Sequence, residues 1–300
     1  MTVQETMQEQ FAYSNITAWH EQGYNGKGVV VWNRENATGN HGASTRSVLE
    51  RICPEATILS AGIQSGFSGD EMLYCTVDGS PVEDFIRNNK VKVISSSIDG
   101  DHNAPVFINM WKDLVEKYNL VLVNSAGNDG TDGINSWFPY EHSIQVGAVS
   151  LVDGKPRVTH YSSIGEEVDF TNFTLWLTGT SFACPYTAGM IALLIGRYGD
   201  LTQNEVYQML KRNAVDLGAQ GKDNYFGWGV PQMPDINSKY ITLTIGSNVM
   251  NVNGQKMFLD TEPIIDGNGR TLVPVRAIAE ALGCEVGWIP SEQKVTITGV

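Results

Sequence analysis

The sequence predicts an α/β protein: a mostly parallel sheet with helices on both faces, followed by a small α+β C-terminal domain. Short apolar runs alternate with helical segments through most of the chain, and this alternation is typical of a parallel sheet. After Pro234 the pattern changes to strand, turn and strand with one short helix. A domain boundary is therefore expected near residue 238, giving domains at 1–238 and 239–300.

Each expected strand is a short apolar run, most of them rich in β-branched residues, which indicates a buried strand. The runs are 27–33, 56–61, 91–95, 120–124 and 143–149. The expected helices cover residues 42–52, 82–88, 106–118, 202–217 and 276–282. Thr202 and Glu205 have the spacing of a capping box, while Gly218 and Gly283 are natural helix stops.

Composition limits the functions that need to be considered. The net charge of −13 argues against a nucleic-acid partner, because phosphate binding requires a basic surface. The longest apolar stretch, Phe182 to Tyr198, is interrupted by polar residues and predicts no membrane span. Met1 to Gln10 is polar and acidic, unlike a signal peptide, so a cytoplasmic location is expected. The four cysteines lack metal-site spacing and are expected to be free thiols.

The segment Gly179 to Pro185 reads Gly-Thr-Ser-Phe-Ala-Cys-Pro. Ser181 stands there between small residues at the start of an apolar helix, where its hydroxyl can be exposed. The positive end of the helix favours developing negative charge. A serine at a helix start is also a common N-cap, so this segment alone leaves a structural role open.

Two further segments place polar residues at the ends of expected strands, where α/β proteins bind ligands. His41 precedes Gly42 at a helix start, and the glycine permits close approach of another part of the chain. Asn128, in the loop that follows a buried strand, can point its amide at an oxyanion. A solvated histidine and ordinary turn residues would explain the two segments separately.

In this order the three segments resemble the subtilisin-like serine protease (subtilase) family. Its motifs are a strand ending in the catalytic Asp, then His-Gly, then a strand ending in Ala-Gly-Asn, then Gly-Thr-Ser-x-Ala-x-Pro. The likeness extends from about Ile16 to Val230.

The resemblance implies a role for each matching residue. Ser181 matches the nucleophile, His41 the general base and Asn128 the side-chain oxyanion donor. The matching substrate-binding residues are Ser97, Ile98, Asp99 and Gly100 on the strand that pairs with a peptide, and Ser125, Ala126 and Gly127 on the opposite wall. An extended peptide or protein substrate is expected, with no metal or other cofactor, while the oligomeric state is left open.

The sequence departs from the family at the triad acid, where Asn33-Arg34-Glu35 replaces Asp-Thr/Ser-Gly. A neutral amide neither fixes the imidazole tautomer nor stabilises the imidazolium, and in triads this change costs about 10⁴-fold in turnover. Glu35 would face the same way as Asn33 if the strand continued, although the strand is expected to end there. The other explanation is that Asn33 inactivates the triad, either as a deliberate change that traps an uncleaved protein or through natural decay.

Two acidic residues bear on specificity. Asp129 follows Asn128, and Asp99 occupies a position that is usually glycine in the family. Carboxylates near the pocket for the residue before the scissile bond would favour Lys or Arg there. The alternative is that both carboxylates face solvent.

Residues 241–300 resemble the small stalk-like module named after the copper amine oxidase N-terminal domain. The likeness rests on Val252-Asn253-Gly254, the stretch from Gly269 to Gly283, and Val286-Gly287-Trp288. Such modules are spacers or binding appendages of bacterial surface proteins, so an extracellular or lysis-released protein is the alternative location. A domain that caps or oligomerises the protease is equally consistent.

Three functions follow. The first is a serine endopeptidase acting through an acyl-enzyme on Ser181, with a weakened triad. The second is a pseudoprotease that binds a peptide or partner without cleaving it. The third is a structural or adhesive role led by the C-terminal module.

Overall fold

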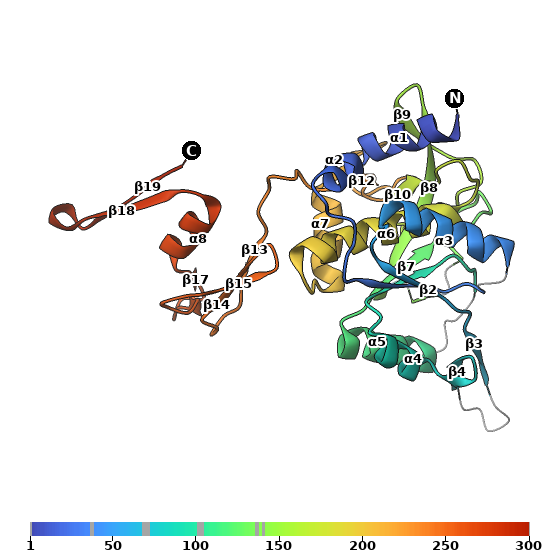
Figure 1. Ribbon diagram of the computed structural model, residues 1–300, viewed down its shortest axis with the longest axis horizontal. Coiled ribbons are helices and arrows are strands. Elements are labelled where there is room, and N and C mark those ends of the chain that lie inside the picture. Colours follow the sequence, from blue (N-terminus) through green and yellow to red (C-terminus); the bar gives the residue numbers. More distant parts are fainter. Residues whose placement is uncertain are drawn as a thin grey trace. The chain divides into compact units, whose positions relative to one another are not determined.

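The computed structural model describes residues 2–36, 39–67, 73–100, 105–135, 138–139 and 142–299. The chain divides into two compact units (Figure 1). Unit 1 comprises Met1–Gly196 and Asp200–Ile236, and unit 2 comprises Arg197–Gly199 and Asn237–Val300. Within the described ranges, no helix is both long enough and apolar enough to cross a bilayer.

Unit 1 is built on a seven-stranded sheet in the order β10-β8-β7-β6-β1-β2, with β9 beside β8. The strands are β1 Val30–Asn33, β2 Thr57–Ser60, β6 Val93–Ser96, β7 Val121–Ser125, β8 Ile144–Val152, β9 Lys155–Val158 and β10 Phe170–Phe173. All pairings along the main path are parallel, and only β9 pairs antiparallel. The predicted α/β fold class is confirmed.

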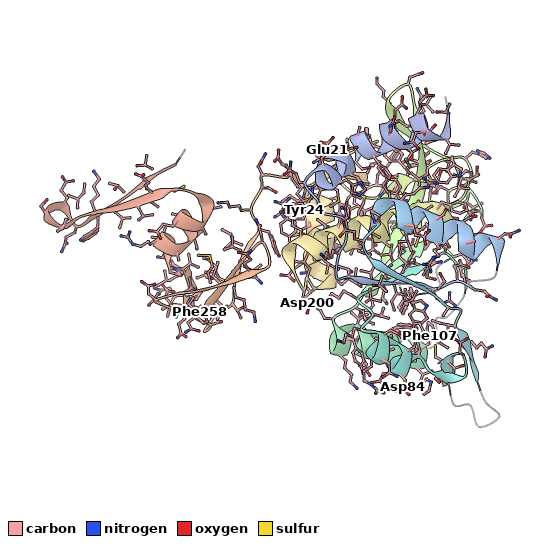
Figure 2. The ribbon with its side chains drawn as sticks, viewed as in Figure 1. Glu21, Tyr24, Asp84, Phe107, Asp200 and Phe258 are labelled. Carbon is pink, nitrogen blue, oxygen red and sulfur yellow. The ribbon has the colours of Figure 1, made fainter. Side chains whose placement is uncertain are left out.

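One face of this sheet carries a continuous apolar layer. Trp32, Ile94 and Leu122 are register partners on three neighbouring strands, and all three are fully buried. Helices α4 (Val82–Asn89) and α5 (Pro105–Tyr118) cover this face (Figure 1). Phe107 of α5, labelled in Figure 2, belongs to the same buried cluster.

Helices α3 (Asn40–Ile52) and α6 (Thr180–Tyr198) lie on the other face (Figure 1). Helix α6 is apolar on all sides, as expected of a helix in the centre of a core. The two helices cross at Gly189, where an added Cβ would lie 2.6 Å from the Cβ of Ile52. The first turns of both helices bear the candidate site residues.

The remaining elements of unit 1 complete its surface. They are α1 Val3–Tyr13, α2 Ile16–Glu21, β3 Gln64–Phe67, β4 Leu73–Val77, β5 Ser80–Pro81, α7 Gln203–Arg212, β11 Ala214–Val215 and β12 Val230–Pro231. The predicted capping box of Thr202 and Glu205 is present at the start of α7. Helix α7 ends earlier than predicted because Ala214 and Val215 pair with β12.

Unit 2 contains small antiparallel sheets and one helix. From residue 237 on, its elements are β13 Ile241–Leu243, β14 Val249–Val252, β15 Gln255–Phe258, β16 Ile264–Ile265, β17 Thr271–Leu272, α8 Val275–Leu282, β18 Glu285–Ile289, a 3-10 turn Pro290–Glu292 and β19 Lys294–Thr298. Gly283 ends α8 with φ +93°, as its stop signal predicted. Buried apolar residues between 237 and 299 are few, namely Met250, Leu259 and Ala279. Phe258, labelled in Figure 2, is 82% exposed.

Candidate active site

Ser181 lies in the first turn of α6. Gly179, just before the helix, has φ +126°, a left-handed conformation that glycine adopts without strain and that lets the chain turn into the helix. Ser181 is 9% exposed. The positive end of the helix dipole favours negative charge that develops beside the Ser181 hydroxyl.

Ser97 connects the end of β6 to Ser181 by two hydrogen bonds. The Ser97 hydroxyl donates to the backbone carbonyl of Ser181 at 2.7 Å, and the Ser181 hydroxyl donates to the carbonyl of Ser97 at 3.4 Å. The second bond is long, so it holds the Ser181 hydroxyl only weakly. The backbone of Ser181 is therefore fixed, while its side chain can turn to a better acceptor.

His41 is the second residue of α3. Its ring centroid lies 5.8 Å from that of Phe182, the residue after Ser181, so the first turns of α3 and α6 meet here. The His41 side chain is 47% exposed, and its Nδ1 atom lies 3.2 Å from Oε1 of Glu35, whose side chain is buried. The imidazole thus has one side against a carboxylate and another open to solvent.

The pKa of His41 is raised above its ordinary value. The side-chain contact with Glu35 is the main cause, burial opposes it, and the charges of Glu35 and Asp99 add to it. The surroundings therefore stabilise the imidazolium, which is the form a general base takes after accepting a proton.

Asn33 makes different contacts from those expected of a triad acid. Its Nδ2 atom donates to the carbonyl of Gly42 at 3.1 Å and to the hydroxyl of Ser60 at 3.4 Å. Asn33 is fully buried at the end of β1. The polar side chain beside Nδ1 of His41 is that of Glu35, so the imidazole has a carboxylate next to it.

Asn128 is held by its neighbour on α6. Its Oδ1 atom accepts hydrogen bonds from the backbone N–H of Thr180 at 2.8 Å and from the Thr180 hydroxyl at 3.1 Å. Because these bonds fix the oxygen end of the planar amide, the NH₂ group is the end available to an oxyanion. The sequence motif did not reveal that Thr180 orients this side chain.

The two predicted walls of the site follow neighbouring parallel strands, β6 and β7. Ser97 is buried, Ile98 packs against the core, and Asp99 is exposed. On the other wall, Ser125 and Ala126 are buried. Gly100 is partly buried and Gly127 is buried. Gly127 has φ +104°, and an added Cβ would lie 2.9 Å from the Ser163 hydroxyl, so both conformation and space require glycine there.

At the exposed edge of these walls, the charge of Asp129 acts on the carboxylate of Asp99. Burial raises the pKa of Asp99, the negative charge of Asp129 raises it further, and His41 lowers it. The backbone N–H of Asp129 donates to Ser163 at 3.3 Å, while its side chain is exposed. The charges of Asp129 and His41 therefore both act on the carboxylate of Asp99.

The described residues contain no cluster of three or more His, Cys, Asp and Glu side chains able to hold a metal ion. All four cysteines are free thiols, as predicted. Cys184, three residues after Ser181, is fully buried, and burial raises its pKa to about 12, so it is a packing residue and not a second nucleophile.

Comparisons with known proteins identify the families that the two parts of the chain match. Residues 10–229 match the family described as the subtilase family, and residues 235–298 match the copper amine oxidase N-terminal domain. The minor extracellular protease Epr of Bacillus subtilis (strain 168) is 30% identical over 61% of this chain and 29% of its own length. The thermostable alkaline protease of Halalkalibacterium halodurans is 26% identical over 61% of this chain and 54% of its own length.

A solved structure supports the fold independently. The psychrophilic subtilisin-like protease Apa1 from Pseudoalteromonas sp. AS-11 matches with a TM-score of 0.59 and 11% identity, over 75% of this chain and 95% of that one. At that identity the likeness concerns the fold alone. The segment that matches the copper amine oxidase domain contains no His and only Cys284, so it lacks the donor set of a copper site.

Proposed function

Because this chain belongs to the subtilase family of serine peptidases, we propose that it is a serine endopeptidase acting through an acyl-enzyme on Ser181. One observation carries the proposal: the first turns of α3 and α6 bring His41 beside Phe182, the neighbour of Ser181, while Thr180 orients Asn128. The proposal takes its nucleophile, base and oxyanion donor from three separate segments, and these two contacts support it.

The chemistry follows from these positions. The Ser181 hydroxyl attacks the peptide carbonyl while His41 takes its proton, and His41 then gives that proton to the leaving amine. The oxyanion accepts hydrogen bonds from the backbone N–H of Ser181 and the amide of Asn128, each such bond being worth about 3 kcal/mol of barrier. A water activated by His41 releases the acyl group and restores Ser181.

The substrate is proposed to be an extended peptide that lies between the two walls. Residues 97–100 would pair with its backbone on one side and residues 125–127 on the other, which is the way a strand adds to a sheet edge. Asp99 and Asp129 give the exposed edge of these walls negative charge. This charge favours a peptide with a basic residue before the scissile bond.

A pseudoprotease is the rival function, and Asn33 in place of the triad acid is the observation that favours it. The contact between Glu35 and His41 weighs against it, because a carboxylate is present where the imidazole needs one. The C-terminal unit is proposed to be a spacer or binding appendage. Removing residues 240–300 tests this role: localisation or binding would change while peptide cleavage continues.

A fluorophosphonate probe tests the peptidase directly, because it reacts with a serine only when that serine is activated. The expected result is one labelled serine, Ser181, with labelling absent from Ser181→Ala and slowed by a competing peptide. Hydrolysis of casein and of a chromogenic peptide should depend on the same residue. An unlabelled wild-type protein that still binds peptide would establish the pseudoprotease instead.

A further inference from the structure

The chain turns sharply where β1 ends. The N–H of Glu35 donates to the carbonyl of Asn33 at 2.8 Å, a bond between residues two apart that is typical of a γ-turn. Arg34 still pairs with β6, because its N–H donates to the carbonyl of Ser95 at 2.9 Å. Strand alternation therefore does not present Glu35 to the site; the turn directs it there.

The turn buries the Glu35 carboxylate against the imidazole. Glu35 is 6% exposed, and its Oε1 atom is 3.2 Å from Nδ1 of His41. A carboxylate at ion-pair distance from Nδ1 favours a proton on that nitrogen and leaves Nε2 to accept the proton of the serine, which is the tautomer a triad requires. Asp99 and Glu35 are the charged groups that act on His41. The charge of Glu35 also acts on the neighbouring guanidinium of Arg34, which donates to the Ser96 hydroxyl at 3.1 Å.

Asn33 has a separate task that an aspartate could not perform. Its amide donates to the carbonyl of Gly42, which also accepts from the Thr45 hydroxyl at 3.1 Å. Gly42 directly follows His41, so this bond ties the end of β1 to the first turn of α3. A carboxylate at position 33 has no proton to donate at neutral pH and would place negative charge against a carbonyl oxygen.

Gly42 provides the space for this arrangement. A Cβ on Gly42 would lie 2.3 Å from the carbonyl oxygen of Asn36 and 3.1 Å from the Cβ of Glu35. Because glycine stands there, the turn at residues 33–36 packs directly on the helix start that bears His41. The amide at position 33, the carboxylate at 35 and the glycine at 42 therefore form one interdependent set.

We propose that Glu35 has taken over the role of the triad acid and that Asn33 is a positioning residue for the helix that carries His41. The inference rests on the proposed peptidase function and concerns which residue orients the base. Glu35 acts through His41, so it too is a positioning residue and does not touch the substrate.

The test compares Glu35→Gln, Glu35→Asp, Asn33→Asp and Asn33→Ala with wild type and Ser181→Ala. Glu35→Gln keeps the shape of the side chain and removes its charge, so kcat and the labelling rate should fall by about 10³- to 10⁴-fold with little change in KM. The acid limb of its pH–rate profile should move to lower pH. Glu35→Asp retains a carboxylate and should restore part of the loss.

The position 33 variants separate this inference from its opposite. If Asn33 only marks a damaged triad, Asn33→Asp should raise kcat strongly while Glu35→Gln has no effect, and that result overturns the inference. The expected result is that Asn33→Asp lowers both kcat and the thermal midpoint, and that Asn33→Ala lowers the midpoint. If Glu35→Gln fails to fold, Glu35→Asp decides: reduced kcat with an unchanged thermal midpoint supports the inference, and wild-type kcat contradicts it.

Failure of the inference and failure of the proposed function give different results. A labelled wild type, an unlabelled Ser181→Ala and a fully active Glu35→Gln overturn the inference alone. An unlabelled wild type without hydrolysis overturns both. An NMR titration of His41 in the Ser181→Ala background provides a readout without activity: Glu35→Gln should lower the pKa of His41, and an unchanged pKa contradicts the pairing.

Discussion

The hydroxyl of Ser97 donates to the backbone carbonyl of Ser181 at 2.7 Å, and Pro185 explains why that carbonyl needs a partner. In an α-helix the carbonyl of residue 181 would accept from the N–H of residue 185, but proline has none. The loop after β6 supplies the missing donor. A proline four residues after Ser181 thereby couples the substrate-binding wall to the nucleophile.

This coupling predicts the stability of variants at both positions. Ser97→Ala leaves the carbonyl of Ser181 without its donor and should lower the free energy of unfolding by about 1–2 kcal/mol. Adding Pro185→Ala should recover part of this loss, because the substitution restores the backbone N–H that the helix lacks. Urea unfolding of the four combinations, made in a Ser181→Ala background to prevent self-cleavage, measures the interaction energy. If the losses of Ser97→Ala and Pro185→Ala simply add in the double variant, the two positions are not coupled through the carbonyl of Ser181.

Asn128 should contribute to turnover and not to substrate binding. Asn128→Ala removes an oxyanion donor, so kcat should fall by about 10²- to 10³-fold with KM nearly unchanged. Thr180→Val removes one of the two bonds that hold the amide and should produce a smaller loss of kcat. Thr131→Ala, at an exposed position of the same loop, controls for disturbance of the loop. Equal losses of kcat from Asn128→Ala and Thr131→Ala would show that the loop matters and the amide does not.

The sequence predicted the fold well because the apolar strands and the helices have strong local patterns. The strands containing Trp32, Ile94 and Leu122 and the helices that cover them lie close to the predicted ranges. Strand β10 was missed, because Phe170–Phe173 is a four-residue run with two polar residues inside it. Those two residues are fully buried, and tertiary contacts decide that burial.

Sequence motifs identified the candidate site residues, but they did not identify the contacts that these residues make. Ser181, His41 and Asn128 stand in segments that the sequence singles out, whereas the partner of the imidazole depends on a turn. Strand alternation gave Glu35 a route to His41 only if β1 continued, yet β1 ends at Asn33. A hydrogen bond between residues 33 and 35 replaces that route, and spacing alone does not predict it.

The raised pKa of His41 predicts a specific pH dependence. A general base is inactive once it is protonated, and a raised pKa means that His41 is protonated at a higher pH. Removing a nearby negative charge lowers this pKa, so the acid limb of the kcat/KM profile should move to lower pH. Asp99→Asn should produce this shift, with Asp113→Asn on the exposed surface of α5 as the control. An unmoved limb in Asp99→Asn would show that Asp99 does not act on the imidazole.

The same pKa shift has a stability counterpart. A group whose pKa is raised in the folded state stabilises the protein below its unfolded pKa, and this stabilisation is lost as pH rises through the folded pKa. In the Ser181→Ala protein, the free energy of unfolding should therefore decline as pH rises from the unfolded pKa of His41 through its folded pKa. The decline should be smaller in Asp99→Asn when thermal unfolding is followed against pH.

Asp99 and Asp129 predict a preference for a basic residue before the scissile bond. An exposed charge pair is worth up to about 1 kcal/mol, so an arginine peptide should exceed its neutral citrulline counterpart by about 2- to 5-fold in kcat/KM. Asp129→Asn should reduce this ratio, and added salt should reduce it in the wild type. Equal rates for the two peptides would show that both carboxylates serve the solvated surface.

Gly42→Ala tests whether the turn and the helix start work as one set. The new Cβ would meet the carbonyl of Asn36 and the Cβ of Glu35, so the turn must move away from His41. Stability should fall by about 1–3 kcal/mol, and the labelling rate of Ser181 should fall with it. Gly39→Ala is the matched control, because its Cβ would approach Asn36 only to 3.7 Å and its φ of −84° suits alanine.

Combining Gly42→Ala with Glu35→Gln shows whether Gly42→Ala acts by removing the contact between Glu35 and His41 or by disturbing the rest of the site. If Gly42→Ala acts by displacing Glu35, it should slow labelling little further in a protein that already carries Glu35→Gln, because both changes remove the same interaction. If it disturbs Ser181 or Asn128 instead, the two losses should multiply. Labelling rates of the single and double variants, measured at one pH on protein shown to be folded, decide between these outcomes.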